Sequence, residues 1–413
     1  MGFLDHSRAA PPSARRENTK KEKKRRVMSE HKGTSNSGSP QEPRSFPHAM
    51  LREIYEQPRA LADTIGHYIP DGKLNPDAFR TVPESMGSKQ RLVIAASGSS
   101  RNAGLAAEIM LEDLAGLAVD VEYASEYCYR SSHTLQDPGV VVVSQSGETA
   151  DTLAALREAK LRGLVTVAIT NNPNSTMALE ADSSLPTYAG KEKAIPATKS
   201  FTTQLAVLYS LTLLLARLRG RMTAPTIEAH GSQLARLPLL LEQVLPAWED
   251  QCRQIAEERK DSQTFLYLGR GVHYAIAREG ALKLKESAYL QAEGYPAGEL
   301  KHGPNALVSR SAPLVILATQ DRSDPDSVLR YSKTVQLMKD MKEQGAQIIA
   351  LANEGDLQVP ALSRHCIFIP ETTEHLLPIL EVVPLQLLAY VFAIQRGIDV
   401  DSPRNLVKAV VQE

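Results

Sequence analysis

A recurring unit constrains the fold of this chain more than any other feature: a short apolar strand runs into a serine- or glycine-rich turn, and a helical stretch follows. In the first half the expected strands are Arg91–Ala96, Val140–Val143 and Leu164–Thr170. In the second half they are Thr264–Leu268, Leu314–Thr319, Gln347–Ala352 and Ile367–Ile369. Strands that alternate with helices form βαβ units and parallel sheets. The sequence therefore predicts two α/β domains of similar design.

The chain has 413 residues, a length sufficient for two or three domains, and its composition indicates where further segments begin and end. Residues 1–46 hold 11 basic and 5 acidic side chains and almost no aliphatic ones, so we expect a disordered basic tail. Leu51, Ile54, Leu61 and Ile65 recur at helical spacing and predict an amphipathic helix that ends near Gly66. The expected divisions after the tail are this helix segment (47–82), the first domain (83–222), a helical connector (223–255), the second domain (256–404) and a C-terminal tail (405–413).

The overall charge argues against nucleic acid or a membrane surface as the partner. Lys and Arg number 47 against 48 Asp and Glu, a net charge of −1, and the chain is 42% hydrophobic. Its longest apolar run, Leu205–Ala216, is shorter than the roughly 20 residues that span a bilayer, so we interpret it as a buried helix. Cys128, Cys252 and Cys366 form no CxxC pair, which favours a reducing, cytoplasmic location over a disulfide framework or thiolate metal site.

Two serine-rich turns are the first candidates for chemistry. Each joins a strand to a helix, at the carboxyl edge where α/β sheets bind ligands. Hydroxyls and helix amides there can hold a phosphate dianion without a lysine. Serines that merely cap helices are the structural alternative. The residues proposed to cradle a sugar phosphate are Ser99, Ser100, Ser144, Gln145, Ser146 and Thr149.

The helix expected over Ala275–Tyr289 carries Glu279, Lys283 and Glu286 on one face. The stripe is either a solvated salt-bridged face or a partly desolvated site whose carboxylate moves a proton between adjacent carbons. The turn just before it, Gly269–Tyr274, begins like a dinucleotide fingerprint but lacks the third glycine and the acidic residue that follows. A nicotinamide site is therefore not expected, and proton transfer alone needs no metal or redox cofactor.

Two further segments carry weaker signals. Glycine and proline bracket His302 within Gly298–Pro304 and fix it at a turn, where it either opens a sugar ring as an acid or base or simply caps the turn. Asp401–Lys408 leads into the terminus and ends on Lys408, a position that is usually solvated.

Longer motifs give the chain a resemblance. From about Phe46 to Glu413 it resembles the isomerase half of glutamine:fructose-6-phosphate amidotransferase, a family with two flavodoxin-like sugar isomerase (SIS) domains of parallel sheets flanked by helices. The matching motifs are Glu53–Pro58, Ser144–Leu153, Glu279–Glu286, Ala297–Pro304, Val383–Tyr390 and Asp401–Lys408.

This resemblance implies roles for the candidates. It assigns the C1–C2 proton shuttle to Glu286, with Lys283 beside it, ring opening to His302 and the open-chain carbonyl to Lys408. It places the sugar phosphate on the serine loops and the sugar beside Ile195 and Ala197. It also implies a homodimer or higher oligomer, in which His302 reaches a neighbour's sugar.

Two departures from the family pattern bear on the reaction. Gly2, not a cysteine nucleophile, follows Met1, so no glutaminase half is expected to precede the isomerase region. Ala197 stands where the synthase pattern has serine, as expected of relatives that deaminate amino sugars. The sequence therefore predicts conversion of glucosamine 6-phosphate and water to fructose 6-phosphate and ammonia. The alternatives are amination of fructose 6-phosphate with ammonia or a separate glutaminase chain, a related deglycase, and a sugar-phosphate-binding regulator.

Overall fold

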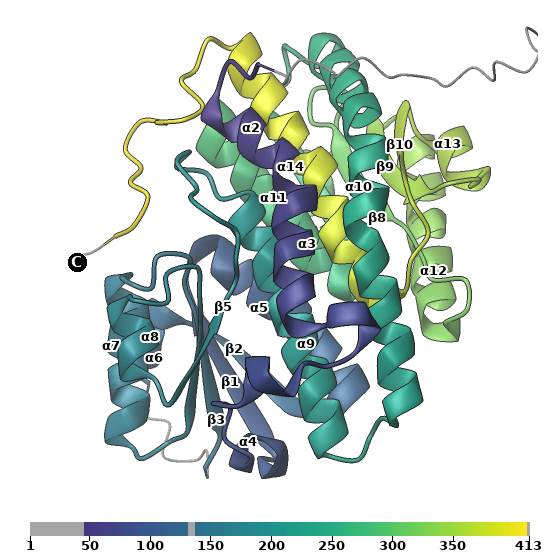
Figure 1. Cartoon of the computed structure of the whole chain (residues 1–413). Helices are drawn as coiled ribbons and strands as arrows, with labels where there is room; N and C mark the ends of the chain where they lie inside the picture. Colours follow the sequence, from purple (N-terminus) through teal and green to yellow (C-terminus); the bar gives the residue numbers. More distant parts are fainter. Residues whose placement is uncertain (1–44, 131–136, 411–413) are drawn as a thin grey trace, which may run out of the picture. The chain divides into compact units, whose positions relative to one another are not determined.

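The computed structural model describes residues 45–130 and 137–410. The predicted disordered tail, residues 1–46, lies almost wholly outside the described residues. Within them, the chain from Pro47 onward forms one compact unit. That unit contains two parallel sheets flanked by helices, which confirms the predicted α/β fold with two flavodoxin-like halves (Figure 1).

Both sheets have five strands and the same order. The first, β2-β1-β3-β4-β5, comprises β1 (Arg91–Ala96), β2 (Ala118–Tyr123), β3 (Gly139–Val143), β4 (Thr166–Thr170) and β5 (Ser183–Pro186). The second, β10-β9-β8-β6-β7, comprises β6 (Thr264–Gly269), β7 (Gln291–Pro296), β8 (Leu314–Ala318), β9 (Ile348–Asn353) and β10 (His365–Ile369). Every pairing is parallel, so in each sheet the carboxyl ends of the strands meet at one edge.

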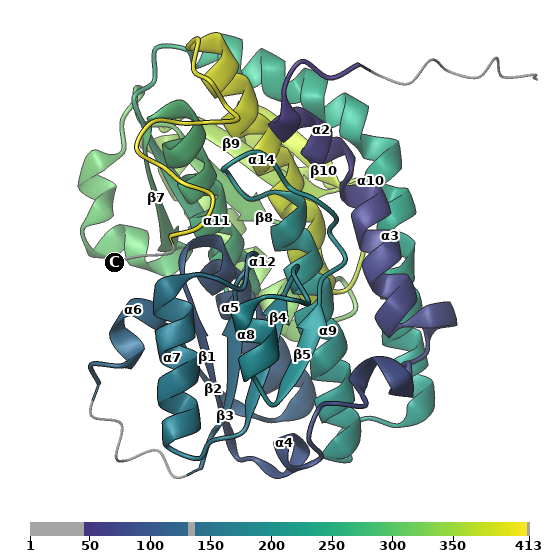
Figure 2. The same cartoon turned by 60° about the vertical axis from the view of Figure 1, so that its left-hand side comes forward.

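Helices cover the sheets and join the two halves. Their bounds are α2 (Ala49–Tyr55), α3 (Gln57–Tyr68), α4 (Ser85–Ser88), α5 (Gly98–Met110), α6 (Ala124–Tyr127), α7 (Ala150–Leu161), α8 (Thr176–Glu180), α9 (Lys199–Leu218), α10 (Ala224–Glu258), α11 (Val272–Ala288), α12 (Pro325–Glu343), α13 (Gln358–Leu362) and α14 (Leu377–Gln395). Short turns are η1 (Pro70–Gly72), η2 (Pro76–Phe79), the π-helical η3 (Leu111–Ala115), η4 (Ala297–His302), η5 (Pro304–Leu307) and η6 (Glu374–Leu376). Helices α5 and α11 pack on each other across the halves, and α10, the helix expected as a connector, runs beside α3 and α14 (Figure 2).

Sequence analysis missed three strands, and all three are edge strands. The central strands β1, β3, β4, β8 and β9 are buried almost throughout. The missed strands β2, β5 and β7 are only partly buried, with half-buried or exposed residues at most positions of β2 and β7, and they carry polar residues. A strand that is covered on one side only needs no continuous apolar run, so its sequence lacks the signal that revealed the central ones.

The amphipathic helix predicted to end near Gly66 is two helices, α2 and α3, separated at Glu56. Pro58 causes the break because it has no amide hydrogen to donate to the carbonyl of Ile54. The side chain of Gln57 donates to that carbonyl instead, at 3.1 Å. The hydrogen bond is retained while the chain changes direction.

Two helices are long and apolar enough to cross a membrane, Lys199–Leu218 and the segment Glu374–Gln395. Burial inside the unit covers 83% and 94% of their most apolar windows, as in core helices, so their length and composition are weak evidence for a membrane span. The buried helix predicted at Leu205–Ala216 is confirmed as part of α9.

Candidate functional site

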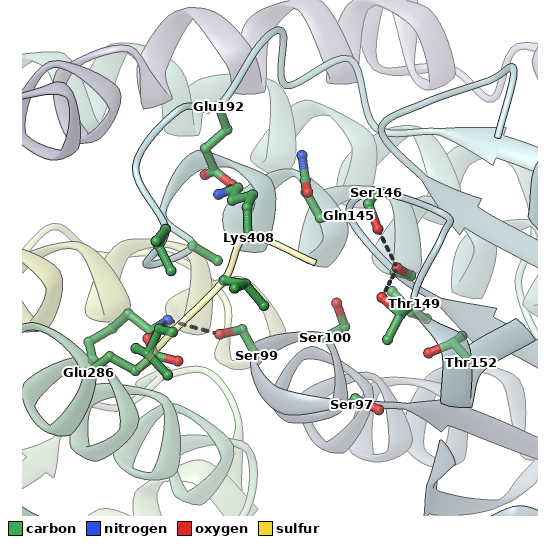
Figure 3. Close-up of a pocket in the computed structure, with 17 residues that line it drawn as sticks. Ser97, Ser99, Ser100, Gln145, Ser146, Thr149, Thr152, Glu192, Glu286 and Lys408 are labelled. Atoms are coloured by element: carbon green, nitrogen blue, oxygen red, sulfur yellow. Dashed lines mark hydrogen bonds and ion pairs between the residues drawn. The ribbon is translucent and has the colours of Figure 1, made fainter. Parts of the chain in front are cut away.

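The two serine-rich turns meet at the carboxyl edge of the first sheet. They follow β1 and β3, the adjacent strands between which the chain reverses its direction of winding, and ligands of open α/β sheets bind at that point. The turns form part of a cavity of about 170 Å³ (Figure 3). Eleven of the twelve predicted site residues line it: Ser99, Ser100, Ser144, Gln145, Ser146, Thr149, Ile195, Ala197, Lys283, Glu286 and Lys408.

The turn after β3 is held by its own hydroxyls. The Oγ of Ser144 lies 2.9 Å from Oγ1 of Thr149 and accepts the amide of Gly147 at 3.2 Å. The Oγ of Ser146 accepts the amide of Glu148 at 3.1 Å. Gly147 has φ +67°, and a Cβ there would stand 2.0 Å from the Oγ of Ser175, so only glycine fits. The loop is a preformed ring of hydroxyls around a cavity.

Ser99 and Ser100 lie in the first turn of α5. Ser97, the residue before the helix, makes no side-chain capping bond, and neither does Thr149 before α7. The hydroxyls of Ser99 and Ser100 instead accept hydrogen bonds from Lys283 and Gln204, each at 3.0 Å. The helix amides therefore stay available to an anion, and simple capping does not explain these serines.

The stripe on α11 is buried, not solvated. Glu279 and Lys283 are 0% and 1% exposed, and Glu286, which reaches the cavity, is 22% exposed. The Nζ of Lys283 lies 2.5 Å from Glu286 and 3.4 Å from Glu279. Burial opposes charge on Lys283, but Glu286 and Glu279 outweigh it and raise the lysine's pKa. An ammonium fixed between two carboxylates holds Glu286 at the cavity wall.

The C-terminal segment closes the cavity. It returns from α14 toward the first sheet, where the amide of Ala150 donates to the carbonyl of Val410 at 3.0 Å (Figure 2). The Nζ of Lys408 donates to Glu192 and to the carbonyl of Ala194, both at 2.6 Å. The terminal lysine is therefore a wall of the cavity and not a solvated end.

Glu192 is the charged residue of the cavity wall that was not predicted from the sequence; Ser97, Val143, Thr152, Leu406 and Val407 also line the cavity without having been predicted. Burial alone would raise the pKa of its carboxyl, but Lys408 and hydrogen bonds from Thr198 and Ser200 outweigh burial and lower it. The buried carboxylate therefore stays ionised and orients the lysine. Nothing local in the sequence marks Glu192 as a site residue, because Lys408, its partner in the cavity wall, lies more than 200 residues away.

The motifs that carry the resemblance support the same loop. Glu53 accepts the amides of Lys193 and Ala194 at 2.6 and 3.2 Å. The carbonyl of Asp401 accepts the amide of Ile195 at 3.0 Å, and its carboxylate caps the start of α2. The first and last motifs thus position the wall that Ile195 and Ala197 contribute.

His302 is the one predicted site residue that the structure does not bring to the cavity. It ends η4 as an exposed side chain and does not line the site of its own chain. Its assignment to ring opening stays a prediction, and it requires a second copy of the chain.

Comparisons with known proteins agree with this architecture. The SIS domain family matches residues 85–214 and 260–396. A glutamine–fructose-6-phosphate aminotransferase (isomerizing) of Caldanaerobacter subterraneus subsp. tengcongensis is 40% identical over 369 residues, which cover 89% of this chain and 59% of that protein. The chain thus spans about three fifths of the length of the curated relatives it matches.

Two solved structures are similar throughout. The C-terminal domain of glucosamine-fructose-6-phosphate aminotransferase from Francisella tularensis has a TM-score of 0.80 at 36% identity, covering 87% of this chain and 99% of that one. A glucosamine-6-phosphate deaminase from Thermotoga maritima has a TM-score of 0.65 at 25% identity, covering 88% and 100%. Relatives with names for both directions of the chemistry therefore share this fold.

Proposed function

The chain belongs to the SIS domain family, homologous to the isomerase half of glutamine:fructose-6-phosphate amidotransferase, and we propose that it deaminates glucosamine 6-phosphate to fructose 6-phosphate. The observation that carries the proposal is the convergence on one cavity of a hydroxyl-lined turn, a carboxylate and an ammonium, contributed by three distant segments. The products are fructose 6-phosphate and ammonia, with one water consumed.

The substrate phosphate is assigned to the serine turns. Ser144, Ser146 and Thr149 offer hydroxyls, and the first turn of α5 offers amides. Hydroxyls and amides bind a dianion without adding a mobile charge. The sugar carbons then extend toward α11 and the C-terminal segment.

Glu286 is assigned the proton transfer. In the open-chain aldehyde it removes the proton from C2 while Lys408 donates a proton to O1, which gives an enolamine. Glu286 returns its proton to C1, which leaves a C2 iminium. The iminium gives a proton back to Lys408, and water hydrolyses the resulting imine to the ketone with loss of ammonia. Lys283 supports this role, because its ammonium at 2.5 Å keeps the carboxylate in place.

The direction of reaction rests on Ala197. Its methyl group lies on the cavity wall, where the synthase pattern has a hydroxyl beside the sugar. A second direction, amination of fructose 6-phosphate with ammonia or with a separate glutaminase chain, is favoured by the 40% identity to proteins named aminotransferases. A regulator that only binds sugar phosphate is the third alternative.

The assembled enzyme is proposed to be a homodimer in the cytoplasm. Exposed His302 supports a shared site, in which it opens the ring bound by the neighbouring chain. Mixing Glu286→Gln chains with His302→Ala chains should then restore activity, up to about a quarter of the wild-type level if mixed dimers form at random. Mixed dimers that stay inactive would contradict a shared site.

One assay separates the three alternatives. The purified chain is incubated with glucosamine 6-phosphate, and separately with fructose 6-phosphate and ammonium, and both sugar phosphates are quantified over time, with Glu286→Gln as control. Ammonia release that the control lacks supports deamination. An initial rate of amination at physiological ammonium that exceeds the rate of deamination supports the second direction, and sugar-phosphate binding without turnover supports the regulator.

A further inference from the structure

A second cavity, of about 510 Å³, uses other faces of the two helices that build the active site. On α11 its lining residues Arg278, Ala281, Leu282 and Lys285 follow helical spacing, whereas Lys283 and Glu286 face the active site. On α5 it uses Gly98, Arg101 and Asn102, next to Ser99 and Ser100. The proposed reaction uses none of these second-cavity residues.

The cavity is cationic and its charges are not neutralised. Among residues 45–130 and 137–410, no Asp or Glu carboxylate lies within 4.0 Å of the cationic groups of Arg101, Arg278 or Lys285. The arginines donate to neutral groups instead: Arg101 to the carbonyl of Val121 at 3.3 Å, Arg278 to the hydroxyls of Tyr274 and Tyr123 at 3.0 and 3.2 Å. Among the described residues, one acidic residue, Glu293, lines the cavity. Its carboxylate accepts hydrogen bonds from Tyr295 and Gln291.

Both guanidinium groups retain unused donors. The Nε atoms of Arg101 and Arg278 are buried and have no hydrogen-bond partner. Burial lowers the pKa of Arg101 and the positive charge of Arg278 lowers it further, whereas Tyr123, Tyr274 and the more distant Glu108 oppose this shift, so the two cations repel each other. Like charges held together without a counterion are costly unless an anion joins them.

The walls add aromatic faces. Tyr123, Tyr274 and Tyr295 line the cavity, and the guanidinium of Arg101 lies 3.7 Å from the ring centre of Tyr123. Stacking on tyrosine keeps the planar donors oriented. A flat, preoriented guanidinium is the group that pairs two donors with two phosphate oxygens.

From this geometry we propose that the second cavity binds a phosphate-bearing small molecule, with its phosphate on Arg101 and Arg278 and its carbon skeleton against the tyrosines. The site is separate from the sugar-phosphate cradle. The two are joined by one polar chain, because Asn102 donates to Glu279 at 2.8 Å, and Glu279 lies 3.4 Å from Lys283 in the active site.

Phosphate stoichiometry tests the proposal, and it does not depend on which reaction the enzyme performs. Inorganic phosphate is titrated into the full chain by isothermal calorimetry at low ionic strength. We expect two phosphates per chain. Arg101→Gln/Arg278→Gln should weaken one of them at least about tenfold, since each arginine supplies a charge-assisted hydrogen bond, whereas Ser144→Ala/Thr149→Ala should weaken only the other.

Three controls keep the result interpretable. Arg270→Gln removes a half-buried arginine that does not line the cavity, so both sites should remain. If the glutamine pair fails to fold, Arg101→Lys/Arg278→Lys takes its place. This variant keeps the positive charges but loses the planar pair of guanidinium donors, so its phosphate affinity should be intermediate. A single phosphate per wild-type chain, bound as tightly by the glutamine pair as by the wild type, overturns the proposal. The proposal is also overturned if the glutamine pair changes the oligomeric state but leaves phosphate binding unchanged. That result would show that the second cavity contacts a second copy of the chain.

Discussion

The carboxyl edges of the two sheets have the same strand order but are filled in opposite ways. In the first sheet, the turns after β1 and β3 carry small serines and leave a cavity between them. In the second sheet, the corresponding strands are β6 and β8, and large side chains fill the space between their carboxyl ends. We call the space at the ends of β1 and β3 the first corner and the space at the ends of β6 and β8 the second corner.

The filled corner is a buried ionic cluster. His273, in the first turn of α11, is 3% exposed and lies between Glu381 on α14, at 2.8 Å, and Glu374, at 3.3 Å. Thr319, directly after β8, donates to Glu381, and Arg330 donates to Glu374 at 2.9 Å. Each carboxylate has at least two partners, so the cluster joins α11, α12 and α14.

The difference between the corners shows how one fold divides function and stability between its copies. Because the strand order is the same, the carboxyl ends of equivalent strands meet at both corners. Residue size and charge after the strands then decide whether a corner stays hollow for a ligand or becomes a cross-link. We therefore expect substitutions in the first corner to affect turnover and those in the second to affect stability.

The largest expected effect is on turnover. Glu286→Gln should lower the deamination rate by about 10²–10⁴-fold, because removal of a general acid or base typically has that effect. Sugar-phosphate affinity should stay close to wild type, since the serine turns are unchanged. Steady-state kinetics and a binding titration measure this, with exposed Glu299→Gln as control. A Glu286→Gln chain with near-normal turnover would contradict the assignment.

The next effect belongs to the second corner. Glu381→Gln should lower the free energy of unfolding by about 3–5 kcal/mol, because it removes one partner of a buried ion pair. Turnover per folded molecule should barely change. Urea unfolding and active-site titration test this, with Ser144→Ala in the first corner as the comparison. Equal stability losses for the two variants would refute the proposed division.

The second corner should also make stability depend on pH. Burial lowers the pKa of His273, but Glu381 and Glu374 outweigh it and raise that pKa to about 10. A raised pKa means that the pair stabilises the fold fully below the unfolded value, about 6.5, and progressively less as pH rises toward 10. Unfolding measured at pH 6, 8 and 10 should show this fall in stability.

A matched variant isolates that pH effect. His273→Leu/Glu381→Leu replaces the histidine and its nearest carboxylate with apolar side chains and should flatten the pH profile between 6.5 and 10. Glu374 accounts for the acidic side of the pH profile. Burial would raise the pKa of Glu374, but His273 is the main cause that outweighs burial and lowers this pKa to about 2. Its contribution is present above about 4.5 and is lost as pH falls toward 2. A wild-type profile as flat as that of the leucine pair would contradict the prediction.

The smallest effect compares two matched glycines. Gly98 and Gly271 each lie at the start of the helix after the first strand of their sheet, and both have φ +53°. A Cβ at Gly98 meets no atom within 4 Å, so Gly98→Ala should cost about 1 kcal/mol of backbone strain. A Cβ at Gly271 would lie 2.9 Å from Cδ of Arg330, so Gly271→Ala should cost more. Denaturation midpoints of the two variants measure the difference, and equal costs would show that the second corner is looser than proposed.

Much of this protein could be predicted from local sequence. The central strands have continuous apolar runs, the serine turns follow them directly, and Glu279, Lys283 and Glu286 share a face through helical spacing. These features depend on residues within about a dozen positions of one another. The edge strands β2, β5 and β7 gave no such signal, because their stability comes from pairing with a neighbour and not from their own composition.

The sequence alone determined that the chain has two α/β halves, with candidate ligand turns at strand ends and a helix that carries Glu279, Lys283 and Glu286 on one face. Only the tertiary structure decided that Glu192 fixes Lys408, that Glu53 and Asp401 support the loop between them, and that His273 fills the second corner. Each of these rests on groups far apart in the sequence, such as the ammonium of Lys408 that lies 2.6 Å from Glu192. Only folding brings such groups within hydrogen-bond distance, and no spacing along the chain records it.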